Sequence, residues 1–285
     1  MSAPDLGGKC CMVTGASAGL GRATALALAR TGASLTLVCR DRSRGEKTVD
    51  EIRRETGNAA VNLMLADLSA QQSIRKLASD FLARGEPLDI LVNNAGVFNL
   101  KRSVTEDNIE TVFAVNHLSY FMLTLLLLAR LKQNARARIV NVASEAHRSG
   151  TIDFDDLEGA RSYRPMHIYG RSKLANILFT YELARRLEGT GVIVNCLHPG
   201  GVATGLGLNN GAIARLLARL IHPFLRTPEE GARTQVYLAS SPEVEGVSGA
   251  YFVDCKPAKS SPESYDASVA RRLWETSARM TGTHG

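Results

Sequence analysis

The sequence predicts a single α/β domain, with a doubly wound parallel sheet of about seven strands and helices on both faces. Short apolar runs with little polar alternation recur along the chain, which is typical of strands buried on both faces. Segments in which apolar residues recur at helical spacing separate these runs, and this alternation indicates a parallel sheet. No linker rich in Gly, Pro or Ser and no repeat interrupts residues 1–285, so we expect one domain.

The expected elements alternate from the first strand onward. Cys10 to Thr14 is a short apolar run that stops at a glycine, and Leu20 to Arg30 has helical spacing until Gly32 ends the helix. We expect further strands at Leu35–Cys39, Val61–Leu65, Ile90–Asn93, Ile139–Ala143 and Val192–Leu197, and further helices at Arg44–Glu55, Ser73–Leu82, Asn108–Leu131 and Lys173–Leu187. The stretch from Gly200 to Thr227 interrupts the alternation and is interpreted as an insertion.

Composition excludes several classes of protein. The 285 residues include 34 Lys+Arg and 28 Asp+Glu, a net charge of +6, and the 45% hydrophobic content excludes a disordered chain. The cations are interspersed with acids, which does not indicate a nucleic-acid-binding protein. Five cysteines, with Cys10 and Cys11 adjacent in an apolar run, indicate reduced thiols and a cytoplasmic location rather than a disulfide scaffold.

Neither the opening residues nor the longest uncharged run predicts a membrane segment. The opening residues lack the cationic start and apolar core of a signal peptide, so no targeting segment is expected. The uncharged run Leu118–Ala129 is twelve residues long, short of the roughly 18 to 20 that span a bilayer. We interpret this run as a buried helix or as the contact of a homodimer.

The segment between the first strand and the first helix is rich in glycine. Gly15, Gly19 and Gly21 form the pattern G-x-x-x-G-x-G. Glycines allow a tight turn and a close approach to a pyrophosphate, whose charge is met by the N–H groups of a helix N-terminus. The segment therefore predicts a nucleotide-binding turn; the alternative is a tight turn that binds no ligand.

Four motifs resemble those of the short-chain dehydrogenase/reductase family and follow in its order: Thr14–Gly21 (TGxxxGxG), Asn93–Gly96 (NNAG), Tyr169–Lys173 (YxxxK) and Pro199–Gly200. Other stretches are similar to the retinol dehydrogenase group and its carbonyl-reducing bacterial relatives: Cys39–Asp41, Val115–His117, Ser172–Asn176, Tyr251–Cys255 and Arg272–Trp274. The resemblance implies a Rossmann-like fold that transfers hydride with a nicotinamide cofactor.

The end of the second expected strand indicates which cofactor binds. A carboxylate there binds the ribose hydroxyls of NAD, whereas an Arg accommodates the 2′-phosphate of NADP. Arg40 follows the strand and favours NADP(H), unless it is only a surface cation, and Asp41 would oppose a phosphate if it turned inward. Asp67 and Leu68 resemble the pair that contacts the adenine; Asp67 is alternatively a helix cap. The resemblance implies these cofactor contacts: Gly15, Ser17, Ala18, Gly19, Leu20, Gly21, Arg40, Asp67, Leu68, Asn94, Ala95, Gly96, Tyr169, Lys173, Pro199, Gly200, Val202 and Thr204.

The predicted catalytic pair is Tyr169 and Lys173, whose i, i+4 spacing places them one turn apart on a helix. A cation lowers the pKa of a neighbouring phenol, which helps it to exchange a proton near neutral pH. By resemblance, Tyr169 is the acid/base, Lys173 lowers its pKa and binds the nicotinamide ribose, and Ser144 binds the substrate oxygen. Asn116 would hold a water that links Lys173 to solvent. No metal is expected, because four histidines that could be candidates lack the spacing of metal ligands. They are His117, His147, His167 and His198.

The insertion at about residues 200–227 is predicted to be a substrate lid. Ala212 to Arg226 has cations on one side and apolar residues on the other, which predicts an amphipathic helix. We expect this helix to pack over a hydrophobic substrate; contact with a membrane surface is the alternative.

The sequence thus predicts an NADPH-dependent oxidoreductase that transfers hydride between the nicotinamide and a carbonyl or alcohol of a lipophilic substrate. Retinal or retinol, a steroid-like ketone and a polyketide ketone are the candidate substrates. The alternatives are a non-catalytic protein that senses the nicotinamide state and a light-dependent, protochlorophyllide-type double-bond reductase. All of them share the fold, which does not by itself decide the activity.

Overall fold

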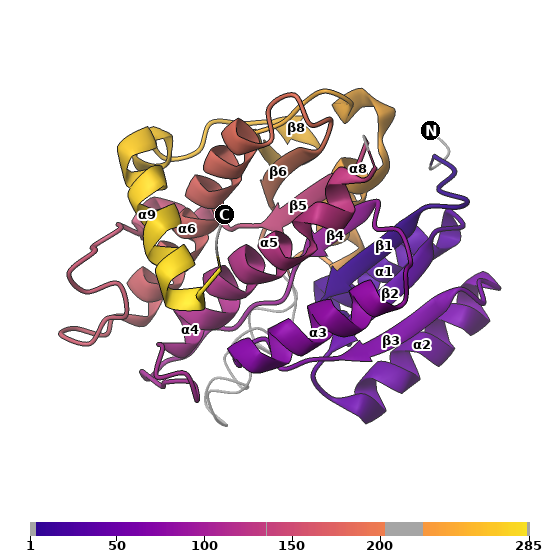
Figure 1. The fold of residues 1–285 in the computed structure, drawn as a ribbon, viewed down its shortest axis with the longest axis horizontal. Coiled ribbons are helices and arrows are strands. Elements are labelled where there is room, and N and C mark those ends of the chain that lie inside the picture. Colours follow the sequence, from indigo (N-terminus) through magenta and orange to yellow (C-terminus); the bar gives the residue numbers. More distant parts are fainter. Residues whose placement is uncertain (1–3, 135, 203–224, 284–285) are drawn as a thin grey trace.

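The computed structural model describes residues 4–134, 136–202 and 225–283 and has helices on both faces of one sheet (Figure 1). In these ranges the sheet has the order β3-β2-β1-β4-β5-β6-β7-β8. Its strands are β1 (Cys10–Thr14), β2 (Ser34–Cys39), β3 (Val61–Leu65), β4 (Ile90–Asn93), β5 (Arg138–Val142), β6 (Ile193–His198), β7 (Tyr251–Val253) and β8 (Lys256–Pro257). All neighbours pair in parallel except β8, which is antiparallel to β7. The predicted fold class is confirmed.

Two layers of helices cover the sheet. The α-helices are α1 (Gly19–Arg30), α2 (Arg42–Thr56), α3 (Gln71–Ala83), α4 (Thr111–Phe113), α5 (Ser119–Lys132), α6 (Pro165–Arg186), α8 (Pro228–Ser240) and α9 (Ala267–Thr281). Shorter helical turns are η1 (Ala114–Leu118), η2 (Glu145–Ser149), η5 (Pro242–Val244) and η6 (Pro262–Tyr265). Helices α1, α2 and α8 form one apolar layer with the sheet, and α3, α5 and α6 form the other, with α9 packed against α5 and α6 (Figure 1).

The six expected strands lie within one residue of their predicted bounds. By contrast, the helix expected at Lys173–Leu187 begins at Pro165. Proline suits the first helical position because its φ is already helical and its missing N–H would have no partner there. The prediction missed this start because the first two turns of the helix carry too few apolar residues for a helical pattern.

The helix expected at Asn108–Leu131 continues from α4 through the π-helical turn η1 into α5. Thr111–Lys132 is 22 residues long, and its most apolar 18-residue window has a mean hydropathy of 1.8, enough to span a membrane by length and composition. However, 78% of that window is buried within the protein. Phe121 shows why: its ring lies 4.9 Å from that of Trp274 in α9 and 5.4 Å from that of Phe179 in α6. The buried core helix that the sequence predicted is confirmed.

Residues 203–224 lie outside the described residues. They include Thr204 and most of the predicted lid and of its amphipathic helix. The flanking residues are hydrogen-bonded to each other, because Arg226 N donates to Gly201 O at 2.8 Å. Val202 and Arg226 form a parallel bridge, and the Arg226 guanidinium pairs with Asp254 in the β7–β8 turn. Both flanks of this segment therefore meet beside the carboxyl end of β7.

Candidate active site

All of the predicted site residues that the structure describes lie at the carboxyl edge of the sheet or on helices that reach this edge. In a parallel sheet the loops after successive strands meet at this edge, and the strand order reverses between β1 and β4, where such folds form a ligand crevice. The predicted residues follow β1 (Gly15, Ser17 to Gly21), β2 (Arg40), β3 (Asp67, Leu68), β4 (Asn94 to Gly96), β5 (Ser144) and β6 (Pro199, Gly200, Val202), with Asn116 in η1 and Tyr169 and Lys173 in α6.

Close packing explains two of the glycines in the turn after β1. Gly15 has a φ of +67°, and a Cβ there would lie 2.8 Å from the Ala95 Cα. A Cβ on Gly21 would lie 2.4 Å from the Gly15 carbonyl oxygen and 2.5 Å from the Asn94 side-chain nitrogen. Since side chains at either position would collide with backbone, these glycines let the turn, the helix and the β4 loop approach one another.

The start of α1 fits a pyrophosphate. Its N-cap residue is Ala18, whose methyl group cannot accept a hydrogen bond from the first N–H groups of the helix. Gly19, Leu20, Gly21 and Arg22 make up the first turn, so neutral and cationic residues surround those groups. An anion is favoured at such a helix end by the free N–H groups and by the helix dipole.

Thr14 and Asn94 hold this turn against the β4 loop. The Thr14 hydroxyl accepts hydrogen bonds from the backbone N–H groups of Asn94 (2.9 Å) and Ala95 (3.1 Å). The Asn94 side-chain nitrogen donates to Thr14 O at 2.8 Å, and Gln235 from α8 donates to its oxygen at 3.3 Å. The Asn94 amide therefore fastens the walls of the cofactor groove together. The sequence interpretation assigned no role to Thr14 or Gln235; the position of Thr14 in the glycine motif was the available signal.

Asn93 lies one residue earlier and is fully buried. Its side-chain nitrogen donates to Thr124 in α5 and to Asn141 in β5, both at 2.9 Å. Asn93 therefore joins β4 to β5 and α5 through side chains of the neighbouring strand and helix.

Arg40 lies directly after β2, at the strand end where the adenosine ribose is expected to bind. Its side chain is exposed, and no residue in the described part of the chain forms an ion pair with it. Asp41 is the N-cap of α2, and its carboxylate accepts a hydrogen bond from Arg44 N at 2.8 Å. Because Asp41 is engaged at the helix end, it does not turn toward the groove, and Arg40 is the charge available there.

Asp67 stabilises a turn after β3. One carboxylate oxygen accepts hydrogen bonds from the Ser69 backbone N (2.9 Å) and hydroxyl (2.6 Å). The N-cap of α3 is Ala70, so the alternative that Asp67 caps this helix is wrong. The side chain of Leu68 is buried in the core between the sheet and α3, which leaves its backbone as the part that can face a ligand.

Lys173 is buried at the end of β5. Its Nζ donates to Val142 O at 3.0 Å and lies 5.7 Å from the ring centres of both Tyr169 and Tyr120. A Cβ on Gly96 would lie 3.6 Å from this nitrogen, so the NNAG loop and the amine are neighbours. Burial lowers the pKa of Lys173 to about 7.

Asn116 occupies the π-helical turn η1, a deviation often found at functional sites. Its oxygen accepts from Val97 N at 2.7 Å, and its nitrogen donates to Val97 O and to Ser172 Oγ, both at 3.0 Å. Both side-chain N–H groups are thus used by protein atoms. The side chain joins the NNAG loop to α6, and the expectation that Asn116 holds a water stays a prediction.

Tyr169 and Ser144 face each other across the site. A hydrogen bond from Ser144 lowers the pKa of Tyr169, but burial has the larger, opposite effect and raises it to about 12. Burial outweighs the effect of Ser144, so the net shift of this pKa is upward. The expected lowering by Lys173 stays a prediction. The Phe98 ring packs edge-on against Tyr169 at 5.7 Å, an apolar contact that the sequence interpretation missed.

Three of the histidines are used inside the protein. His117 contacts Asn176 Oδ1 at 3.4 Å and Ser277 Oγ at 2.9 Å, and His147 and His198 each contact the backbone of the turn after β5. Burial lowers the pKa of all three, to about 4 for His117. They act as neutral hydrogen-bonding groups within the fold.

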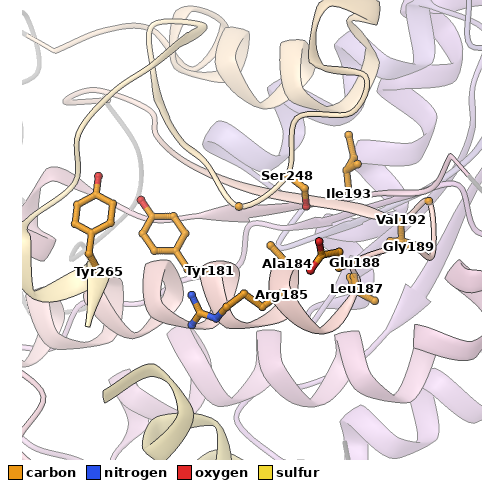
Figure 2. Close-up of a pocket in the computed structure, with 12 residues that line it drawn as sticks. Tyr181, Ala184, Arg185, Leu187, Glu188, Gly189, Val192, Ile193, Ser248 and Tyr265 are labelled. Atoms are coloured by element: carbon orange, nitrogen blue, oxygen red, sulfur yellow. The ribbon is translucent and has the colours of Figure 1, made fainter. Parts of the chain in front are cut away.

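A separate surface cavity of about 530 Å³ lies at the opposite, amino edge of the sheet. Figure 2 shows Tyr181 and Tyr265 at one end of it and the loop between α6 and β6 at the other. The two tyrosine rings stack at 5.5 Å. Among the described residues that line this cavity, none belongs to the predicted site, so the catalytic groups and the cavity are distinct features.

Comparisons with known proteins agree with this geometry. The family model described as short chain dehydrogenase matches residues 9–212. The chain is 48% identical to Retinol dehydrogenase 14 of Homo sapiens over 291 residues, which cover 96% of this chain and 87% of that protein. It is 46% identical to Retinol dehydrogenase 12 of Mus musculus over 275 residues, with 96% and 87% covered.

Solved structures share the whole architecture. A crystal structure of an uncharacterized protein from Mycobacterium paratuberculosis superposes with a TM-score of 0.81 at 31% identity, covering 99% of this chain and 97% of that one. The NADP active-site complex of RhlG from Pseudomonas aeruginosa gives a TM-score of 0.69 at 26% identity, with 87% and 95% covered. The chain belongs to the short-chain dehydrogenase family, the NAD(P)(H)-dependent oxidoreductases that act on CH–OH groups.

Proposed function

We propose that this oxidoreductase uses NADP(H) and interconverts the aldehyde or ketone and the alcohol of a lipophilic substrate, with a retinoid as the first candidate. The observation that carries the proposal is the convergence of three groups at one point. The Ser144 hydroxyl is close enough to the Tyr169 phenol to lower its pKa, and Lys173 lies one helical turn away beside the NNAG loop. A proton donor, an oxygen-binding hydroxyl and a cation thus lie together near the carboxyl end of β5.

The chemistry follows from these positions. When bound, the nicotinamide supplies or accepts the hydride. For reduction, Tyr169 donates its proton to the carbonyl oxygen, and Ser144 donates a hydrogen bond to the same atom. Burial keeps the pKa of Tyr169 at about 12, so the phenol holds its proton until a more basic oxygen forms. Charge on Lys173 then stabilises the phenolate. The residues therefore suit carbonyl reduction in particular.

The preference for NADP(H) is supported by Arg40. A guanidinium forms bidentate, charge-assisted hydrogen bonds with a phosphate, and the exposed Arg40 stands at the strand end where the adenosine ribose is bound in such folds. Asp41, which would repel the phosphate, is held at the start of α2 by Arg44 N.

The lipophilic substrate is supported by apolar side chains next to the phenol. Phe98 packs on the Tyr169 ring. Met166 precedes Tyr169 by three residues in α6, which places it on the same helix face, and the residue is 58% exposed. The names of the relatives specify retinol for those proteins, and the apolar surroundings of Tyr169 suit a molecule of that kind.

We further propose that the protein works in the reducing environment of the cytoplasm. The five cysteines are all unpaired, and Cys11, Cys39 and Cys196 are buried. Burial raises the pKa of each of these three thiols, which keeps them in the unreactive, protonated form. A protein built with disulfides for an oxidising compartment would pair such residues.

A substrate panel tests the function. NADPH oxidation is measured with retinal, aliphatic aldehydes, steroid ketones and quinones, in the dark and in light. We expect turnover in the dark, with kcat/KM highest for a long apolar aldehyde. NADPH binding without turnover on any substrate would support the nicotinamide-sensing alternative, and light-dependent reduction of a carbon–carbon double bond would support the protochlorophyllide-type one. Either result would overturn the proposal.

A further inference from the structure

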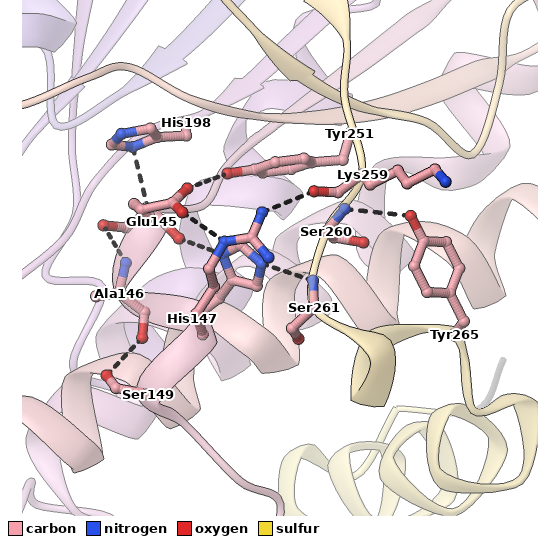
Figure 3. Close-up of polar contacts among 12 residues, drawn as sticks. Glu145, Ala146, His147, Ser149, His198, Tyr251, Lys259, Ser260, Ser261 and Tyr265 are labelled. Carbon is pink, nitrogen blue, oxygen red and sulfur yellow. Dashed lines mark hydrogen bonds and ion pairs between the residues drawn. The ribbon is translucent and has the colours of Figure 1, made fainter.

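The turn that carries Ser144 is bonded on one side to a segment near the C-terminus. We call residues 144–150 the Ser144 turn and residues 259–261 the C-terminal strap; Figure 3 shows the contacts between them. His147, whose side chain is completely buried, lies between the two. Ser261 N donates to His147 Nε2 at 3.0 Å, and His147 Nδ1 lies 2.7 Å from Ser144 O.

These contacts determine the protonation of the ring. A backbone N–H can only donate, so Nε2 must carry a lone pair toward Ser261. The proton of the neutral ring is therefore on Nδ1, where it is donated to the Ser144 carbonyl. Burial lowers the pKa of His147, in agreement with a neutral ring. The imidazole thus links the strap to the backbone of Ser144 by two directed hydrogen bonds.

The strap is itself anchored to the body of the protein. Ser260 N donates to the Tyr265 hydroxyl at 3.1 Å, and its side chain contacts the Tyr181 hydroxyl of α6 at 2.8 Å. Arg148 in the turn donates to Lys259 O at 2.8 Å. The strap therefore provides a fixed reference for His147 rather than a loose chain end.

The other side of the Ser144 turn lies directly on α6. A Cβ on Gly150 would lie 2.3 Å from the Gly170 carbonyl carbon, and a Cβ on Gly170 would lie 2.5 Å from Ala146 O. Gly170 is the neighbour of Tyr169. The turn is thus pressed against the helix that carries the phenol and is held there by the strap behind it.

We propose that His147 is a positioning residue that sets the Ser144 hydroxyl at its distance from Tyr169. The inference rests on the proposed function and adds to it a group that does not touch the substrate. His147 acts through one bond in particular, the one to the Ser144 carbonyl, which fixes the backbone from which the hydroxyl projects. A displacement of about 1 Å at such a group costs on the order of a hundredfold in rate.

Conservative variants separate the two hydrogen bonds. The side-chain nitrogen of Asn occupies the place of Nδ1, and the side-chain oxygen of Gln occupies the place of Nε2. His147→Asn therefore keeps the donor to Ser144, His147→Gln keeps the acceptor for Ser261, and His147→Ala keeps neither. We expect kcat to fall at least about tenfold in His147→Ala and His147→Gln and to be largely rescued in His147→Asn, with the Kd for NADPH unchanged in all three.

A double-mutant cycle shows whether His147 acts through Ser144. In a Ser144→Ala background, His147→Ala should lower kcat no further, because the hydroxyl to be positioned is gone. Equal losses in both backgrounds, or equal activities of His147→Asn and His147→Gln, would overturn the inference.

A matched control accounts for lost stability. Asn58→Ala removes hydrogen bonds to Ala29 O (3.1 Å) and Ala33 O (2.9 Å) at the amino edge of the sheet, so it should lower the unfolding free energy and leave kcat unchanged. Hydrogen exchange provides a readout without turnover: the amides of the Ser144 turn should exchange faster in His147→Ala than in Asn58→Ala. Unchanged exchange would contradict the inference, whereas a wild-type protein that reduces no carbonyl would contradict the proposed function.

Discussion

The side-chain nitrogen of Lys173 donates a hydrogen bond of 3.0 Å to the backbone oxygen of Val142. Val142 ends β5 two residues before Ser144, so this bond ties the catalytic helix to the strand that carries the oxygen-binding hydroxyl. Asn176, one turn further along α6, donates to the same oxygen at 3.2 Å. The relative placement of Tyr169, Lys173 and Ser144 is therefore fixed through one carbonyl group before any ligand binds.

Burial of Lys173 predicts a stability that rises with pH. Its pKa is about 7 in the fold against an ordinary value of 10.5, so the unfolded chain binds the proton more tightly between these values. This group should add about 2 kcal/mol to the unfolding free energy between pH 7 and pH 9. Urea unfolding at both pH values checks this, with Lys173→Met as the control that lacks the increment. An equal pH dependence in the two proteins would contradict the expectation.

Replacing Tyr169 by Phe should abolish turnover. The variant removes the proton that the carbonyl oxygen requires, while the ring still packs against Phe98. We expect kcat to fall by at least about a hundredfold, with the Kd for NADPH, measured by fluorescence, within a factor of about two. Tyr163→Phe is the matched control, because its hydroxyl donates to Asn99 O at 3.0 Å outside the catalytic group. Turnover by Tyr169→Phe at the wild-type rate would remove Tyr169 from its proposed role.

Removing the charge of Arg40 should impair NADPH more than NADH. Arg40→Ala loses the partner of the 2′-phosphate, and a charge-assisted bidentate contact of this kind contributes about 2 kcal/mol. We expect the KM for NADPH to rise at least about tenfold and the KM for NADH to change little. Arg42→Ala serves as the control, because Arg42 is exposed nearby and pairs with Glu46. Parallel changes in both KM values would show that Arg40 does not select the cofactor.

A methyl group on Gly21 should disrupt the cofactor groove. The new Cβ would lie 2.4 Å from Gly15 O and 2.5 Å from the Asn94 side chain, and overpacking of this kind costs about 1–3 kcal/mol. For Gly21→Ala we expect a lower Tm and a Kd for NADPH raised at least about tenfold. In Gly7→Ala the nearest atom is an Asp5 carboxylate oxygen at 3.2 Å, so this variant should retain the wild-type Kd. A wild-type Kd in Gly21→Ala would contradict the close packing of the turn.

The buried His117 should lower the unfolding free energy of the protein in acid. Burial lowers its pKa from an ordinary value of 6.5 to about 4, so the unfolded chain binds the proton first as the pH falls. The unfolding free energy should therefore decrease by up to about 3 kcal/mol from this group between pH 6.5 and pH 4. His117→Gln should show a shallower decrease in denaturant titrations. A slope unaltered by His117→Gln would refute the assignment.

Much of the fold could be predicted because the relevant signals are local. A strand buried on both faces is apolar throughout, so Cys10–Thr14 and Ile90–Asn93 were recognisable from their own residues. The i, i+4 spacing of Tyr169 and Lys173 also identified a pair that any helix would bring together. The three-residue β7 carries too short a pattern to be recognised by periodicity, and no strand range was predicted there.

Residues close together in the chain are enough to predict the elements, the glycine turn and the identity of the chemical groups. The tertiary structure decided how those groups are held. The contacts of His147 with Ser261, of Asn116 with Ser172 and of Gln235 with Asn94 join residues that are 114, 56 and 141 positions apart. Hydrogen bonds across such distances are chosen by packing, because only the closed fold brings these partners within reach and removes the water that would otherwise satisfy them.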